Sequence, residues 1–217
     1  MAGLTIATEP TQEPLSLQEV KDYLRVEDNT DERILQSMIE TARRFAEEHL
    51  GRSLMQQTIH QFIDGYDEIE DPLFEGFRKG PFLTYYKNYI TIARPPVVSI
   101  TSVSTFNDAD TETTFASSKY YLDNAREPAR IVLRNGETFP TSLRVANAIK
   151  IVYVSGYTSP FQVPEPIRLG MMQHIPHLYE HRGDMYNSVG YPPSLQKLYQ
   201  PYVVMKGLSS SSLLSIG

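Results

Sequence analysis

The sequence predicts an α+β protein in which a helical hairpin and a C-terminal helix form a small bundle, with an antiparallel β-sandwich or barrel region inserted between them. Apolar residues within 16–51 recur with the period of an amphipathic helix. Residues 54–157 instead hold short runs of β-forming residues separated by turn residues. Helical periodicity returns after residue 163. The predicted segments are an N-terminal extension (1–15), a helical hairpin (16–53), a β-rich insertion (54–157) with a long loop (65–88), a second helical part (163–206) and a flexible tail (207–217).

The helical hairpin carries sequence signals at its ends. Ser16 and Glu19 have the spacing of a capping box, in which each side chain accepts the backbone N–H of the other residue. Asn29 or Thr30 is expected to cap the second helix, and Gly51 to end it in a left-handed conformation. The second helix has a wide apolar face made of Ile34, Leu35, Met38, Ile39, Ala42, Phe45 and Ala46.

The inserted region and the third helix follow from local composition. Strands are predicted at 54–63, 89–92, 97–106, 120–122, 131–133 and 149–154. Pro95 and Pro96 mark a corner or an edge, because proline cannot donate a hydrogen bond to a neighbouring strand. Pro164 and Pro166 suit the first turn of a third helix, which Pro176 is expected to kink. Its apolar face consists of Ile167, Met171, Ile175 and Leu178.

Composition excludes several classes of protein. The chain of 217 residues has no cysteine, so it has no disulfide, no thiolate metal ligand and no cysteine nucleophile. Its net charge of −6 makes it a poor candidate for binding nucleic acid through the phosphates. The N-terminus lacks the features of a signal peptide, and no apolar run approaches the roughly 20 residues of a membrane span. We expect a soluble protein, made in the cytoplasm, without a membrane partner.

A histidine cluster on the third helix suggests one catalytic alternative. His177 and His181 are four residues apart, so both imidazoles could bind one metal ion in a metal-dependent hydrolase. However, Glu180 directly precedes His181, which breaks the zinc-protease pattern, and no third ligand is evident. The interpretation we favour is a partly exposed helix end, whose negative pole attracts the imidazoles of His174, His177 and His181.

Other motifs do not indicate chemistry. Asp108, Asp110 and Glu112 lack the glycine and the final glutamate of a calcium loop, and indicate a solvated turn. Phosphate-binding glycine loops and the nucleophile motif of hydrolases are absent. Three arginines recur at every fourth position: Arg126, Arg130 and Arg134. They would share a face within a strand, but Pro128 between them favours a loop beside the edge of a sheet. We therefore expect no catalytic residue, no metal ligand and no cofactor, and hence no enzyme.

Two segments are candidates for contacts with other proteins. The loop at 65–88 is acidic in its first part and aromatic and basic in its second, so it either forms a contact surface or folds back over the barrel. Its candidate contact residues are Phe74, Phe77, Phe82, Tyr85 and Tyr86. The C-terminal tail offers Leu208, Leu213, Leu214 and Ile216 as anchors for an extended segment.

Several stretches carry a family resemblance and occur in a consistent order. They are residues 13–25 (EPLSLQEVKDYLR), 31–54, 94–103 (RPPVVSITSV), 107–110, 155–157 and 178–182. Each is short, but together they resemble the phage head–tail connector (adaptor) proteins of long-tailed phages, prophages and gene transfer agents. The resemblance extends over residues 13–182.

The resemblance implies a structural virion protein at the head–tail interface rather than an enzyme. Such a protein forms a ring under the portal, extends the DNA channel and provides the platform for tail attachment. The implied partners are the portal protein, a tail-completion (stopper) or tail tube protein, and further copies of the chain in a ring expected to be twelvefold. Genome DNA would pass through without sequence-specific binding, which agrees with the negative charge. A tail-side or minor capsid protein with a small β-barrel is the alternative.

Overall fold

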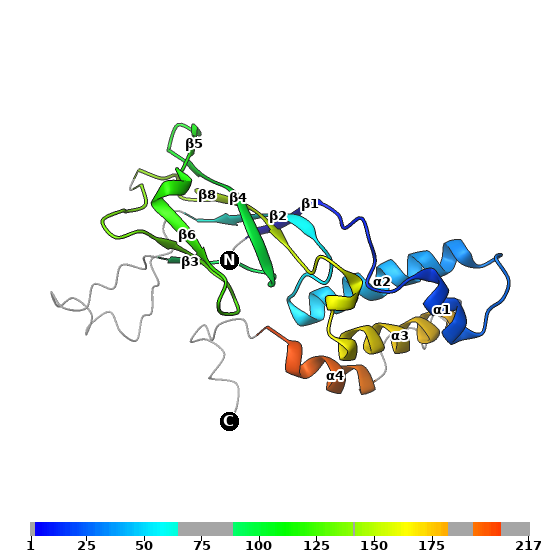
Figure 1. The fold of residues 1–217 in the computed structure, drawn as a ribbon. Helices are drawn as coiled ribbons and strands as arrows, with labels where there is room; N and C mark the ends of the chain where they lie inside the picture. Colours follow the sequence, from blue (N-terminus) through cyan, green and yellow to red (C-terminus); the bar gives the residue numbers. More distant parts are fainter. Residues whose placement is uncertain (1–2, 65–88, 141, 182–192, 205–217) are drawn as a thin grey trace, which may run out of the picture. The chain divides into compact units, whose positions relative to one another are not determined.

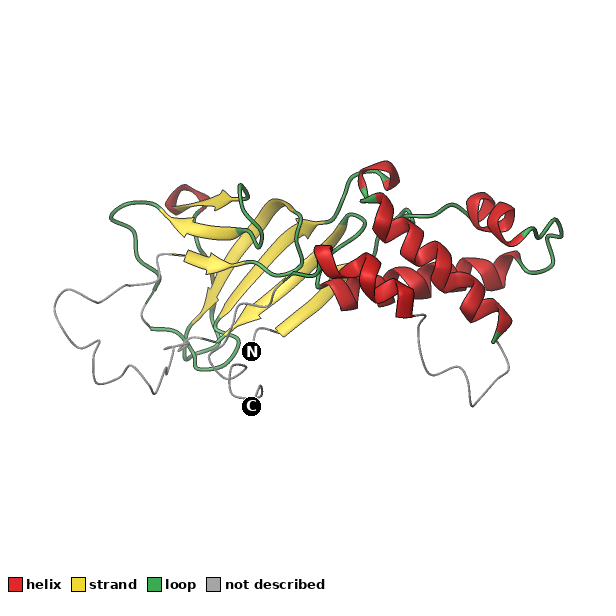
Figure 2. Ribbon diagram, turned by 90° about the horizontal axis from the view of Figure 1, so that it is seen from below, coloured by secondary structure: helices red, strands yellow, loops and turns green. Residues whose placement is uncertain are grey.

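The computed structural model describes residues 3–64, 89–140, 142–181 and 193–204, which fold into two compact units. The sheet unit contains residues 3–8 and the described residues of 58–155. The helical unit contains residues 9–57 and the described residues of 156–204. Figure 1 colours the chain along its sequence, and Figure 2 shows the α-helices in one unit and the strands in the other. The predicted α+β class is confirmed.

The described part of the helical unit is built from two helices that precede residue 58 in the sequence and two that follow residue 155. They are α1 (Leu17–Leu24), α2 (Glu32–Leu50), α3 (Glu165–Glu180) and α4 (Pro193–Tyr199), with single 3-10 turns at Pro160–Gln162 and Gln200–Tyr202. The predicted capping box begins α1: the Glu19 N–H donates to Ser16 Oγ over 3.2 Å, and the Ser16 N–H donates to Glu19 Oε2 over 2.7 Å. Gly51 ends α2 with φ of 67°, as predicted.

The predicted cap of α2 is wrong. Asp31 occupies the N-cap position, and its side chain makes no capping hydrogen bond. Asn29 instead accepts a hydrogen bond of 2.6 Å from Lys21 Nζ, and the Thr30 hydroxyl donates to Asp28 over 2.8 Å. Asn29 therefore bonds a side chain of α1, and Thr30 bonds a neighbour in its own loop, so both candidate caps bond partners other than the first amides of α2.

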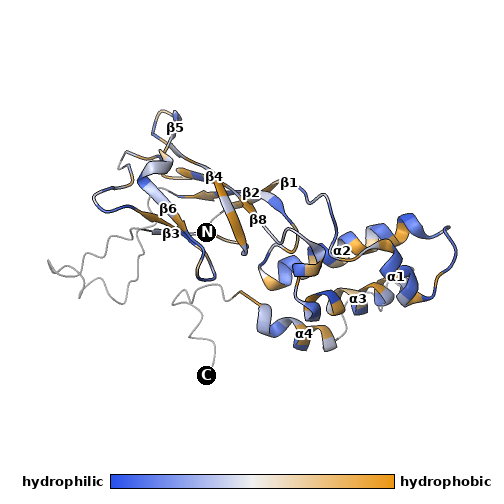
Figure 3. Cartoon of the chain, in the orientation of Figure 1, coloured by the Kyte–Doolittle hydropathy of each residue, from blue (hydrophilic) through white to orange (hydrophobic). Residues whose placement is uncertain are grey.

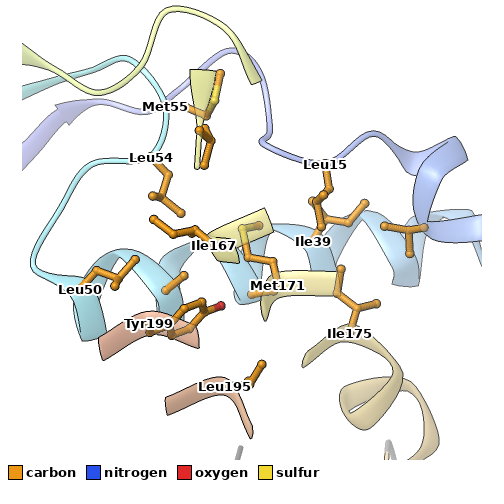
Figure 4. Close-up of a cluster of buried hydrophobic side chains, with 14 of the residues drawn as sticks. Leu15, Ile39, Leu50, Leu54, Met55, Ile167, Met171, Ile175, Leu195 and Tyr199 are labelled. Atoms are coloured by element: carbon orange, nitrogen blue, oxygen red, sulfur yellow. The ribbon is translucent and has the colours of Figure 1, made fainter. Parts of the chain in front are cut away.

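The helical unit has its own hydrophobic core, shown in Figure 4. One side of α2 packs against α3, and Figure 3 shows how apolar and polar residues alternate along these helices. Ile34 departs from the predicted apolar face, because its side chain is 43 % exposed. The core residues of α2, α3 and α4 are Leu35, Ile39, Ala42, Ala46, Leu50, Ile167, Met171, Ile175, Leu195 and Tyr199.

The sheet unit is built from two sheets. The strands are β1 (Gly3–Thr8), β2 (Gln57–Ile63), β3 (Tyr89–Thr91), β4 (Val97–Phe106), β5 (Glu112–Thr114), β6 (Tyr120–Asp123), β7 (Arg130–Leu133) and β8 (Ile149–Ser155). A five-stranded sheet has the order β1-β2-β8-β4-β5, and a three-stranded sheet has the order β3-β7-β6. Both sheets contribute to one core, which includes Ile59, Val103, Ile131, Ile151 and Tyr153.

Two strands lie where none was predicted. β1 falls within the segment predicted as an N-terminal extension, and β5 follows the predicted solvated turn. Every residue of both strands is exposed. β5 has no apolar residue, and the alternation of β1 is limited to Leu4 and Ile6, which are 42 % and 41 % exposed. Both are the edge strands of the five-stranded sheet, held by pairing with β2 and β4 rather than by a buried face.

Candidate functional site

The histidines of α3 do not form a metal site in the described part of the chain. No group of three or more His, Cys, Asp or Glu side chains among those residues could hold one ion. His181 Nδ1 lies 2.9 Å from the carbonyl oxygen of His177, and the two rings are 4.4 Å apart. His174 is buried and packs edge-on against Phe45, which corrects the expectation of a partly exposed position. Burial, together with the charge of His177, lowers the pKa of His174.

A buried ion-pair network around Arg43 organises the helical unit. Arg43 lies in α2 and is only 2 % exposed. Its Nε donates to Glu13 over 2.8 Å, and its Nη1 donates to Glu47 over 3.1 Å. Glu9 lies 3.6 Å from Nη2. One guanidinium therefore joins α2 to the segment that leads from β1 to α1.

Glu47 extends this network toward the start of β2. Its carboxylate is as buried as Arg43 and accepts a hydrogen bond of 2.7 Å from the Leu54 N–H. It also accepts one of 3.1 Å from the side chain of Gln57, the first residue of β2. Each oxygen of this buried carboxylate thus has a donor, as burial of a charge requires. The network holds three segments distant in sequence: residues 9–13, α2 and residues 54–57.

The ionisation of the network follows from its burial and its charges. Burial lowers the pKa of Arg43, but the carboxylates of Glu13 and Glu47 outweigh it and raise that pKa overall. Burial raises the pKa of Glu13, and this effect exceeds the opposing influence of Arg43. The arginine therefore stays charged, and its role is to position the surrounding segments.

A second ionic contact joins the beginnings of α1 and α3. Arg168 Nη2 donates to Glu19 over 2.6 Å, and its Nε donates to the carbonyl oxygen of Pro14 over 3.1 Å. Burial raises the pKa of Glu19, but hydrogen bonds from Ser16 and the charge of Arg168 outweigh it, so that pKa is lowered overall. Glu19 thus serves both as the capping-box acid of α1 and as the acceptor for α3.

Both sides of α2 border grooves. One groove of about 750 Å³ is lined by Thr30, Arg33, Ile34, Ser37, Met38, Thr41, Leu178 and His181. The other, of about 560 Å³, is lined by residues of the 12–17 segment and by Gln36, Ile39, Glu40 and Pro160. The first contains the exposed side chain of Ile34. The linings are mixed, without the convergent titratable groups of an active site, and they fit contact with another protein surface better than catalysis.

The interface residues predicted from the sequence lie outside the described residues. These are Phe74, Phe77, Phe82, Tyr85 and Tyr86 in the 65–88 loop, and Leu208, Leu213, Leu214 and Ile216 in the tail.

The Arg43 network was not predicted, although a signal for it exists. Ile39, Arg43 and Glu47 follow one another at intervals of four residues, so two charged residues lie on the apolar side of α2. No described helix is long and apolar enough to span a bilayer.

Comparisons with known proteins agree with this architecture. Residues 14–77 match the family model described as "Phage gp6-like head-tail connector protein". No curated protein sequence matches the chain. Among solved structures, a chain of the "Neck of empty GTA particle computed with C6 symmetry" superposes with a TM-score of 0.70 at 19% identity, covering 95% of this chain and 98% of that chain.

Two further solved structures contain chains with the same fold. A chain of the "Virion of native gene transfer agent (GTA) particle" has a TM-score of 0.69 at 17% identity and covers 95% of this chain and 97% of that chain. A chain of the "Neck of native GTA particle computed with C12 symmetry" has a TM-score of 0.65 at 18% identity and covers 95% of this chain and 98% of that chain. The predicted resemblance is confirmed: residues 14–77 match the phage gp6-like head-tail connector family, and the chain as a whole has the fold of chains from gene transfer agent particles.

Proposed function

We propose that this protein is a structural head–tail connector of a virion or gene transfer agent particle. It forms a ring under the portal, extends the DNA channel and provides the platform on which the tail attaches. The observation that carries the proposal is the extent of the match to a chain of a gene transfer agent neck, with 95% of this chain and 98% of that chain covered.

The physical character of the chain supports this role. A ring of identical subunits requires an interface in which one surface of each copy contacts a different surface of the next. The groove beside Ile34 and Met38 offers an exposed apolar surface on a helix, as such a contact needs. The net charge of −6 suits a channel through which DNA passes without being bound.

The partners follow from the position of the ring. On one side it contacts the portal protein, and on the other a tail-completion (stopper) or tail tube protein, with twelve copies to match the portal. The loop residues Phe74, Phe77, Phe82, Tyr85 and Tyr86 contact the tail component or the adjacent subunit. The tail residues Leu208, Leu213, Leu214 and Ile216 bind the portal or a neighbouring copy. The protein has no catalytic activity in this role.

Electron microscopy of the purified protein mixed with its portal tests the proposal. We expect a ring of twelve copies on the portal. One or two copies on each portal would contradict the connector function. Absence of any affinity for the portal would favour a tail-side or minor capsid protein, and stoichiometric zinc by elemental analysis would favour a hydrolase that uses His177 and His181.

A further inference from the structure

The outer face of the three-stranded sheet carries an ordered group of tyrosines and arginines. Tyr89 of β3 and Tyr121 of β6 both pair with Val132 of β7, so the three side chains form one row across the sheet. Tyr89 is 38 % exposed and Tyr121 is 46 % exposed. The opposite face is apolar and packs into the core through Ile131 and Leu133. We call the residues Tyr89, Thr91, Tyr121, Arg130, Val132 and Arg134 the tyrosine–arginine face.

Each arginine of the face lies over a tyrosine of a flanking strand. The guanidinium of Arg130 is 5.1 Å from the ring centroid of Tyr89, and that of Arg134 is 5.8 Å from the ring centroid of Tyr121. Such stacking leaves the edge of a guanidinium available for a carboxylate. Arg130 already pairs with Asp123 over 2.7 Å, whereas Arg134 is exposed and pairs with no carboxylate among the described residues.

This surface has the composition of a protein contact site. Tyrosine and arginine are enriched where proteins bind one another, and side chains held by stacking lose little freedom on binding. Two of the three arginines that recur at every fourth position in the sequence, Arg130 and Arg134, thus belong to one exposed face. Pro128 precedes β7 and does not disrupt it. Asp123 lies on the same face and offsets Arg130, so Arg134 leaves the face with a net positive charge. In a chain of net charge −6, such a face favours an acidic partner.

We propose that the tyrosine–arginine face binds the acidic stretch 66–75 of the same chain, whose sequence is YDEIEDPLFE. The stretch has no lysine or arginine and offers carboxylates at Asp67, Glu68, Glu70, Asp71 and Glu75. Ile69 and Leu73 supply apolar side chains for the tyrosine row. Its charge is complementary to that of the face, and its composition matches the mixture of aromatic and basic side chains there.

The attachment of the stretch favours binding within one chain. Before it, Asp64 accepts a hydrogen bond of 2.8 Å from the Asn147 N–H in the sheet unit. After it, the described chain resumes at Tyr89, which belongs to the face itself. A ligand tethered at both ends has an effective concentration on the order of millimolar, so weak ionic contacts suffice. The binding does not depend on the connector function, and either can fail alone.

Site-specific photocrosslinking tests the proposal in the full-length protein. Tyr121→p-benzoylphenylalanine places the crosslinker on the face, and we expect mass spectrometry to find crosslinks to residues 66–75. The same substitution at Val98, which is 42 % exposed in the same unit and lies at the end of β4 that pairs with Ser155, is the matched control and should not reach that stretch. Crosslinking from position 121 without any product in 66–75 would overturn the proposal.

Isotope mixing distinguishes one chain from two. In a mixture of ¹⁵N-labelled and unlabelled protein, crosslinks within one chain contain a single isotope. Mixed-isotope products would instead assign the face to the acidic stretch of a second copy and overturn binding within the chain.

Charge-reversal substitutions test whether opposite charges hold the acidic stretch on the tyrosine–arginine face. Arg134→Glu should lower the crosslinking yield about fivefold, the equivalent of losing one ionic contact, and Glu70→Arg in the same chain should restore part of it. Arg33→Glu, an exposed change on α2, should leave the yield unchanged. Equal yields with Arg134→Glu and Arg33→Glu would show that charge does not hold the stretch.

Discussion

Arg43 is the residue at which the N-terminal segment, α2 and the start of β2 converge. Its guanidinium bonds Glu13 and Glu47, and Glu47 accepts hydrogen bonds from the segment at 54–57. A buried ion pair gives little net stability compared with a well-packed apolar substitute. Removing one partner is costly, however, because the other charge then stays buried without compensation.

Arg43→Met is therefore expected to lower the free energy of unfolding by about 3–5 kcal/mol. Arg44→Met removes exposed pairs with Glu40 and Glu9 and should cost less than about 1 kcal/mol. Urea denaturation at neutral pH measures both. Equal losses for the two variants would contradict a structural role of the buried network.

Gly156 is a second residue whose type the structure dictates. Its φ is +112°, and a Cβ there would lie 2.1 Å from the carbonyl oxygen of Met55. That contact belongs to the bridge between Met55 and Tyr157, where the two chain segments leading to β2 and from β8 lie side by side. A side chain at this position meets backbone, which cannot move aside as a flexible side chain can.

Gly156→Ala should thus destabilise the protein by about 3 kcal/mol or more, since it combines backbone strain with a steric clash. Gly136→Ala is the matched control: φ is +85° there, but nothing lies within 4 Å of the added Cβ. It should cost about 1 kcal/mol through strain alone. Thermal unfolding of both variants checks the difference, and similar melting temperatures would show that the segments at 55 and 156 separate easily.

At the scale of elements, α4 approaches α3 closely at Gly170. Tyr199 of α4 is fully buried, and a Cβ on Gly170 of α3 would lie 2.3 Å from its Cε1 atom. The end of the described chain is fixed as well, since the Val204 N–H donates to the carbonyl oxygen of Leu50 over 2.8 Å. Glycine within a helix normally costs stability, so its presence here indicates a packing requirement.

Gly170→Ala distinguishes helix propensity from close packing, because the two change the free energy of unfolding in opposite directions. Helix propensity alone would stabilise α3 by about 1 kcal/mol, whereas displacement of Tyr199 should give a net loss of stability. We also expect faster hydrogen exchange in residues 193–199. Leu169→Ala, at a neighbouring half-exposed position, should leave exchange in α4 unchanged. A stabilised Gly170→Ala variant with a protected α4 would contradict the close packing.

The elements also show which features local sequence determines. The apolar periodicity of α2, the capping box at Ser16 and the bounds of β4 were predicted correctly because each depends on neighbours in the chain. The exposed strands β1 and β5 were missed, since they are held by pairing with β2 and β4, and their own residues carry at most the two alternating apolar side chains Leu4 and Ile6. The partners of Arg43 depend on tertiary contacts across some 30 positions of the sequence, which local periodicity does not encode.

At the scale of the whole molecule, the proposed connector function places demands on the tail beyond the described residues. Four consecutive serines, 209–212, have little preference for regular structure and cannot form a core. Leu208, Leu213, Leu214 and Ile216 are apolar enough to bind a groove or a sheet edge on the portal or a neighbouring copy. Each contributes roughly 1.5–3 kcal/mol when fully buried, before the cost of ordering is subtracted.

Truncation after Gly207 tests this contribution. We expect weaker portal binding and an unchanged melting temperature of the isolated protein, because the tail acts only in the assembly. Repetition around a ring multiplies a weak contact, so the loss should exceed what one isolated subunit shows. Replacing the four apolar tail residues by serine in the full-length chain separates side-chain contacts from chain length. Portal binding equal to that of the intact protein in both variants would show that the tail has no part in the assembly.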